Sequence, residues 1–200
     1  MSKIAVDIVL LPDEAVTEES IKANRDLVGR QGRHIVLNKD TCLPHISLAM
    51  GCIESADIEP VGRLLQVVAK NCLTGGLVIT GVATTLNALG RQVSAFILAQ
   101  TRELQSLHER LMNEMQTYFS YDVTAEMVYG DEDVAETTLA WIRSFREKAG
   151  FRAFFPHITL GYGMIAESMT FPMHFAASRL ALCHLGNHCT CRKVLTSVGL

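Results

Sequence analysis

One five-residue pattern occurs twice in the chain, and this repeat constrains the fold more than any other feature. Residues 44–48 read Pro-His-Ile-Ser-Leu and residues 156–160 read Pro-His-Ile-Thr-Leu, and we call them the first and the second motif. They lie in opposite halves of a chain of 200 residues, and a glycine follows each within a few positions. Because the chain holds only seven histidines and five prolines, the repeat indicates a duplicated structural unit.

Each motif is typical of a strand with one polar and one apolar face. Successive side chains of a strand point to opposite faces, so His45 shares a face with Ser47 and His157 shares one with Thr159. A proline is tolerated at the start of a strand. A single histidine on a strand is more often structural, and duplication alone would preserve a pattern. Two polar residues on the same face in both copies nevertheless favour a functional pair facing one cleft.

Hydrophobic periodicity predicts further elements on both sides of each motif. The expected helices cover residues 17–30, 57–71, 101–118 and 132–149. The expected strands cover residues 4–11, 34–37, 77–85, 92–99, 179–185 and 191–198. No linker or low-complexity tract divides the chain, so residues 1–200 are expected to form one domain. The order of the elements indicates a duplicated α+β unit.

Composition excludes some classes of protein. Hydrophobic residues make up 48% of the chain, charged residues make up 20%, and the formal net charge is −3. A chain with this balance is not expected to coat long nucleic acids, which bind strongly basic domains. No apolar run reaches the roughly 18–20 residues of a membrane span, so no membrane partner is expected. Six cysteines in an ordinary chain favour reduced thiols and a cytoplasmic location over a disulfide scaffold.

The two motifs resemble the paired His-x-Ser/Thr motifs of the 2H phosphoesterase superfamily. That superfamily includes LigT-like 2′,3′-cyclic phosphodiesterases and 2′-5′ RNA ligase-like proteins. Motif spacing, chain length and element order agree over essentially the whole chain. The resemblance implies a bilobal α+β domain with two antiparallel sheets, flanking helices and a central catalytic groove. It implies that His45 and His157 are the catalytic pair, and that Ser47 and Thr159 bind the phosphate.

The chemistry of the motif residues fits those roles. Two histidines with pKa values near 6.5 can hold opposite protonation states at neutral pH and exchange protons with a phosphate ester. Neighbouring hydroxyls can donate hydrogen bonds to the phosphate oxygens. We therefore expect a monomeric, metal-independent hydrolase without a cofactor. Its substrate would be a nucleoside or RNA 2′,3′-cyclic phosphate, or ADP-ribose 1″,2″-cyclic phosphate. The sequence does not say which histidine is the base, nor whether RNA ligase activity exists.

One departure from the family concerns the cation that holds the phosphate. Several LigT-like members carry an arginine just after the second motif, where this chain has Gly161-Tyr162-Gly163. Arg152 is a candidate replacement, although an ordinary surface residue is an equal interpretation. The aromatic side chains of Phe155 and Tyr162 are candidates for stacking on a nucleobase.

Two other functions stay open from the sequence. One is a nucleotide-binding module of the same fold with little catalysis. The other is a metal-binding regulator that uses four ligand-type residues near the C-terminus: His184, His188, Cys189 and Cys191. Their spacing matches none of the usual structural zinc patterns, so the site is expected to hold no metal.

Overall fold

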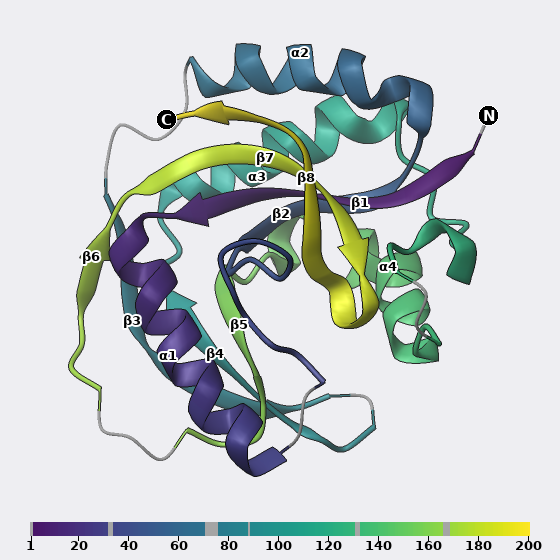
Figure 1. Ribbon diagram of the computed structural model, residues 1–200. Helices are drawn as coiled ribbons and strands as arrows, with labels where there is room; N and C mark the ends of the chain where they lie inside the picture. The colour runs from purple at the N-terminus through teal and green to yellow at the C-terminus, as the bar shows by residue number, and fades with distance from the viewer. Residues whose placement is uncertain (1, 32–33, 71–75, 88, 131–132, 166–168) are drawn as a thin grey trace.

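The chain folds as α+β, with helices packed on one curled antiparallel sheet (Figure 1). A computed structural model describes residues 2–31, 34–70, 76–87, 89–130, 133–165 and 169–200. Within them the strands are β1 (Lys3–Pro12), β2 (Ile46–Glu54), β3 (Leu77–Leu86), β4 (Gln92–Leu98), β5 (His157–Tyr162), β6 (Met173–Phe175), β7 (Ala177–Gly186) and β8 (Thr190–Gly199). The α-helices described there are α1 (Glu14–Gln31), α2 (Ile58–Ala69), α3 (Arg102–Glu114) and α4 (Glu136–Lys148).

The two motif strands lie next to each other in the middle of the sheet. Among the described residues the strand order is β6-β3-β4-β5-β2-β1-β7-β8. The two inner strands, β2 and β5, are paired through Ile46 and Ile158. The expectation of two separate sheets is therefore wrong, because this central pair continues the hydrogen-bonded ladder from one half into the other. The duplicated, bilobal organisation stays a prediction.

The helices cover the sheet with their apolar sides. In α2 the buried residues Val61, Leu65 and Val68 recur at helical spacing, and this helix packs on β7 and β8. α3 and α4 pack on β2, and α1 packs on β5. One large apolar cluster runs beneath both halves of the sheet. No helix in the described ranges is long and apolar enough to cross a lipid bilayer.

Most expected elements are present with shifted ends. The hairpin expected from residues 77–85 and 92–99 is confirmed as β3 and β4. The helix expected over 101–118 is shorter, because α3 gives way to a 3₁₀ turn at Met115–Thr117. Residue 71, the expected end of the second helix, lies outside the described residues. So does residue 132, the expected start of the fourth helix.

The strand expected over residues 34–37 is absent, and a buried asparagine explains why. Asn24 of α1 donates from Nδ2 to the carbonyl of Ile35 at 2.9 Å and accepts from the amide of Leu37 at 2.8 Å. These two bonds satisfy backbone groups that a strand would have paired with a neighbour. The segment therefore lies as a loop against α1 and needs no partner strand.

A disulfide links the last two strands. Cys183 of β7 and Cys191 of β8 are bonded, with their Cα atoms 5.6 Å apart, within the usual range for a disulfide. The prediction of reduced thiols is wrong for this pair, since the β7–β8 hairpin brings two cysteines distant by eight positions onto the same face. Cys42, Cys52 and Cys189 lie outside this disulfide.

Candidate active site

The structure brings both motifs to one cleft. Ile46 and Ile158 are fully buried and face each other across the β2–β5 pair. Antiparallel pairing around them places each histidine on the side of the other motif's hydroxyl residue. His45, Ser47, His157 and Thr159 all line a cleft of about 470 Å³. The predicted sharing of one face by the polar residues of both motifs is therefore confirmed.

Both histidines are held in the same tautomer by the same local device. Nδ1 of His45 lies 2.8 Å from the carbonyl oxygen of Leu43, and Nδ1 of His157 lies 2.8 Å from that of Phe155. A carbonyl oxygen only accepts hydrogen bonds, so each neutral ring carries its proton on Nδ1. The motif proline stands between each histidine and that carbonyl. In both rings Nε2 is left with a lone pair for proton exchange.

Burial disfavours the charged form of both rings. It lowers the pKa of His45 to about 4, with a smaller lowering from the charge of His157 and an opposing contribution from the Leu43 carbonyl. Burial likewise lowers the pKa of His157, against the raising effect of the Phe155 carbonyl. Because the charge of His157 affects the pKa of His45, the two rings lie near each other in the cleft.

The two motif hydroxyls differ in their surroundings. Ser47 donates from Oγ to Oδ2 of Asp7 on β1 at 2.6 Å. The same carboxylate oxygen lies 3.9 Å from Nε2 of His45, beyond hydrogen-bonding range. Thr159 has no comparable carboxylate partner among the residues that the structure describes. The symmetry of the two motifs is therefore broken by one buried aspartate.

A bulge in β5 turns Tyr162 into the cleft. Strand alternation from His157 would place Tyr162 on the opposite face, but the β4–β5 register shifts where Ser94 pairs with Gly161 and Ala95 with Thr159. Gly161 has φ +139°, a conformation that residues with a side chain rarely adopt. Asn24 holds the bulge by donating to the carbonyl of Leu160 at 2.7 Å. Tyr162 consequently lines the same cleft as Thr159.

A strained turn brings His188 beside Tyr162. The turn Asn187–Cys189 between β7 and β8 has φ +60° at His188 and +54° at Cys189. Side chains from the start of α4 support it, because the Thr138 hydroxyl donates to Oδ1 of Asn187 at 2.9 Å. The Tyr162 hydroxyl lies 3.2 Å from Nδ1 of His188, and the two rings are 5.4 Å apart. Backbone strain of this kind is often found at functional sites, which makes the turn a candidate part of the site.

The other predicted substrate-binding residues have different outcomes. Phe155 lines the cleft with more than half of its surface exposed. Arg152 is exposed on the turn Phe151–Ala153 and lies outside the residues that line the cleft. Lys148, in the last turn of α4, does line it and was missed, since a lysine at a helix end carries no distinguishing signal. Trp141, in the middle of α4, also lines the cleft and was missed, because helical periodicity does not say what its side chain faces.

His108 fixes the two motifs from behind. Its Nδ1 donates to the carbonyl of Leu48 at 2.6 Å, and its Nε2 accepts from the amide of Phe151 at 2.7 Å. Its ring stacks on Phe154, two residues before the second motif, with the ring centres 4.1 Å apart. This fully buried residue therefore joins the end of the first motif to the entry of the second.

The C-terminal cluster does not converge on a metal site. Cys191 is committed to the disulfide, His184 bonds through Nε2 to the carbonyl of Met127 at 3.0 Å, and His188 faces Tyr162. No group of three or more His, Cys, Asp or Glu side chains able to hold a metal occurs among the described residues.

Asp7, which contacts Ser47, was not among the predicted site residues, although the sequence carries a signal for it. It is the charged residue inside the apolar run Ile4–Leu11, and a charge within such a strand is costly unless it has a role.

Compared with protein-family models and with curated proteins, the chain has no match.

Proposed function

We propose that the protein is a cyclic phosphodiesterase of the 2H phosphoesterase type, which opens a cyclic phosphodiester on a ribose with two histidines. The observation that carries this proposal is the pairing of the two motifs on adjacent central strands. It gives one cleft two histidines with the same fixed tautomer and two hydroxyls beside them. The proposal includes the family's bilobal domain, with the two halves of the sheet as its lobes.

The proposed reaction is acid–base hydrolysis. Nε2 of one histidine removes a proton from the attacking water, and Nε2 of the other donates a proton to the leaving ribose oxygen. We assign the base to His45, because burial lowers its pKa to about 4 and so keeps the ring neutral near pH 7. His157 is then the acid. Its proton is stabilised by the bound anionic phosphate, since a nearby negative charge favours the protonated ring.

Other residues of the cleft fit the remaining parts of a nucleotide. The Thr159 and Ser47 hydroxyls are placed to bind non-bridging oxygens, whose negative charge develops during the reaction. Lys148, and not Arg152, supplies the positive charge for the substrate phosphate. Trp141, Phe155 and Tyr162 offer flat aromatic faces to a nucleobase, a contact that demands little of the base sequence.

A panel of cyclic phosphates tests this function. Nucleoside 2′,3′-cyclic phosphates, a short RNA ending in a 2′,3′-cyclic phosphate and ADP-ribose 1″,2″-cyclic phosphate are incubated with the protein, with and without a chelator. Phosphorus NMR of the product shows which ester bond opened. We expect hydrolysis of at least one substrate at a rate that the chelator does not change. Failure to open any of them would overturn the proposal.

A further inference from the structure

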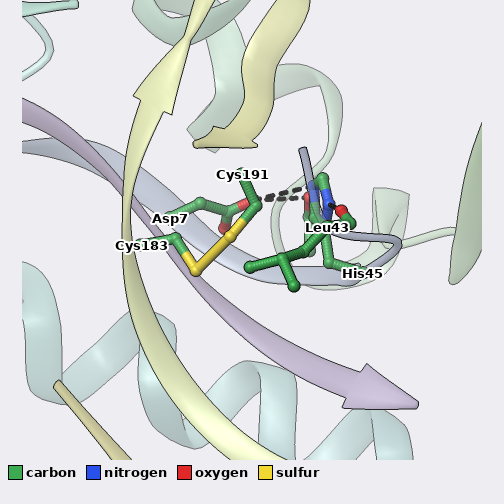
Figure 2. The surroundings of a disulfide bond; sticks show 6 residues. Asp7, Leu43, His45, Cys183 and Cys191 are labelled. Carbon is green, nitrogen blue, oxygen red and sulfur yellow. Dashed lines mark hydrogen bonds and ion pairs between the residues drawn. A yellow bond between two sulfur atoms is a disulfide. The ribbon is translucent and has the colours of Figure 1, made fainter. Parts of the chain in front are cut away.

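The aspartate beneath the first motif has a geometry that the reaction alone does not explain. Asp7 is completely buried on β1, and its Oδ2 accepts the hydrogen bond from Ser47. Among the described residues its Oδ1 has no hydrogen-bond partner. Figure 2 shows the Asp7 side chain beside the Cys183–Cys191 disulfide and close to His45. A buried carboxylate with one unpartnered oxygen is costly in its charged form and much less so when protonated.

The direction of the Ser47 hydrogen bond conflicts with binding of a phosphate. When Asp7 is ionised, the Ser47 hydroxyl must donate to it at 2.6 Å, because a carboxylate only accepts. Only the lone pairs of Ser47 then face the cleft. A phosphate oxygen is also an acceptor, so the two oxygens repel each other. With an ionised Asp7, the first motif therefore presents the wrong partner to an anionic substrate.

Protonation of the aspartate reverses the bond while the heavy atoms stay in place, because only the Ser47 hydroxyl hydrogen turns. A separation of 2.6 Å between two oxygens suits donation in either direction. We infer that Asp7 is a protonated carboxylic acid when phosphate is bound, and that it donates to Ser47 Oγ so that Ser47 donates to the phosphate. The proton comes from solvent as the anion enters, and it returns to solvent when the product leaves. Asp7 is thus a positioning residue that acts through Ser47.

The surroundings of Asp7 agree with a neutral carboxyl group. Burial raises its pKa well above the usual value, against the lowering effects of the Ser47 hydroxyl and the Ala49 backbone. From the position just before β2 it is faced by His45, whose Nε2 lies 3.9 Å from Oδ2 and whose pKa burial lowers. From the β7–β8 turn the charge of Asp7 reaches Cys189, whose pKa burial and Asp7 both raise. Its partner on β7 is Cys183, which is bound in the disulfide and does not titrate.

The inference rests on the proposed phosphate site, and binding rather than turnover tests it. Adenosine 2′-monophosphate is titrated into the whole protein by calorimetry from pH 6 to pH 9, in two buffers of different ionisation enthalpy. The buffer difference gives the number of protons taken up. Asp7→Asn is isosteric, stays neutral and can donate from its amide to Ser47. The nucleotide and the two histidines titrate in both proteins, so the comparison isolates Asp7.

We expect wild-type protein to take up more protons per bound nucleotide than Asp7→Asn, the difference approaching about one at the alkaline end. Over that range wild-type affinity should fall by up to about tenfold per pH unit more than that of Asp7→Asn. Ser47→Ala breaks the same chain one atom later and should also lose the extra proton. Thr159→Val is the matched control on the other motif. It should weaken nucleotide binding but retain the extra proton uptake.

Equal proton uptake by wild-type protein, Asp7→Asn and Ser47→Ala would overturn the inference, even if the enzyme hydrolyses cyclic phosphates. Absence of nucleotide binding in all the proteins would overturn it together with the proposed function. Proton uptake without hydrolysis of any cyclic phosphate would support the role of Asp7 and leave only the catalytic proposal rejected.

Discussion

In the proposed reaction the two histidines set the pH range of activity. One ring must be neutral and the other protonated, and burial lowers the pKa of both below the usual 6.5. The protonated ring is lost as the pH rises past these values, and the neutral base is lost in stronger acid, where His45 titrates at about 4.

We therefore predict a bell-shaped profile of kcat/KM with its maximum on the acid side of pH 6.5, since this ratio reports the pKa values of the free enzyme. Initial rates from pH 4 to pH 9 with a nucleoside 2′,3′-cyclic phosphate measure it. A maximum above pH 7.5 would contradict the assignment of two buried histidines to acid and base.

For single residues, the sequence predicts which face the polar side chains of the motifs share, but not which residues surround them. Period-two alternation is enough to put His45, Ser47, His157 and Thr159 on one face. It does not say which strand lies alongside, so the contact of Ser47 with Asp7, 40 positions earlier, was not foreseen. Lys148 reaches the cleft from a helix, and strand alternation does not predict its position there either.

Single elements also carry features that alternation cannot predict. The β5 bulge depends on Gly161, which turns Tyr162 to the cleft, and the loop at residues 34–37 depends on Asn24. In both places a local exception in the backbone decides the face or the element. Such exceptions arise from contacts between distant segments, here α1 with β5, and these are absent from a local pattern.

Gly161→Ala tests the bulge. We predict a loss of about 2 kcal/mol in the free energy of unfolding, from the positive φ and from a Cβ that would lie 3.0 Å from Nδ2 of Asn24. Turnover should fall as well, because without the bulge the Tyr162 side chain no longer points into the cleft. Gly81→Ala is the control, since its Cβ would meet nothing within 4 Å. Urea denaturation compares them, and equal stability of the two variants would refute the role of the bulge.

The turn at His188 permits a cleaner separation of strain from function. Replacement by glycine or by alanine removes the same ring, but only glycine adopts φ +60° without cost. We predict that His188→Gly is more stable than His188→Ala by about 1 kcal/mol. Both should raise KM by the same factor, about tenfold for roughly 1.4 kcal/mol of lost binding.

Thermal denaturation and initial rates measure the two effects of the His188 variants. Equal stability of the glycine and alanine variants would show that the turn stores no strain. An unchanged KM in both would show that the ring does not contact the substrate.

For the whole molecule, buried histidines make the fold sensitive to acid. Burial lowers the pKa of His45, His108, His157 and His184 below 6.5, so the unfolded chain binds more protons as the pH falls below that value. Stability is then present above pH 6.5 and is lost on acidification. Asp7 acts in the opposite direction, because its raised pKa lets the folded state bind the extra proton.

Four histidines outweigh one aspartate. We predict that the free energy of unfolding falls from pH 7 to pH 5 by about 1.4 kcal/mol per pH unit for each net proton. Urea midpoints at several pH values measure the slope, and His108→Gln should reduce it. Stability that is constant or rises towards pH 5 would contradict the buried, neutral state of these rings.

The sequence predicts the α+β class of the whole molecule better than it predicts how the strands join into a sheet. Element order and the repeated motif predict an α+β chain with both motifs on strands. The second motif enters β5 at His157 as expected, whereas β2 begins at Ile46, so His45 stands directly before its strand. Element order and the motif do not predict that Ile46 and Ile158 pair and so join the two halves into a single sheet. That contact connects residues from opposite halves of the chain, and only the assembled core decides it.

The central claim is that His45 and His157 together open a cyclic phosphodiester. The most direct measurement is the single-turnover rate of opening of a nucleoside 2′,3′-cyclic phosphate by wild-type protein, His45→Asn, His157→Asn and the double variant. We predict that each single variant loses at least about a hundredfold in rate. The double variant should lose little more than either single one, because the two rings act as a unit. Wild-type rates in either single variant would contradict the account.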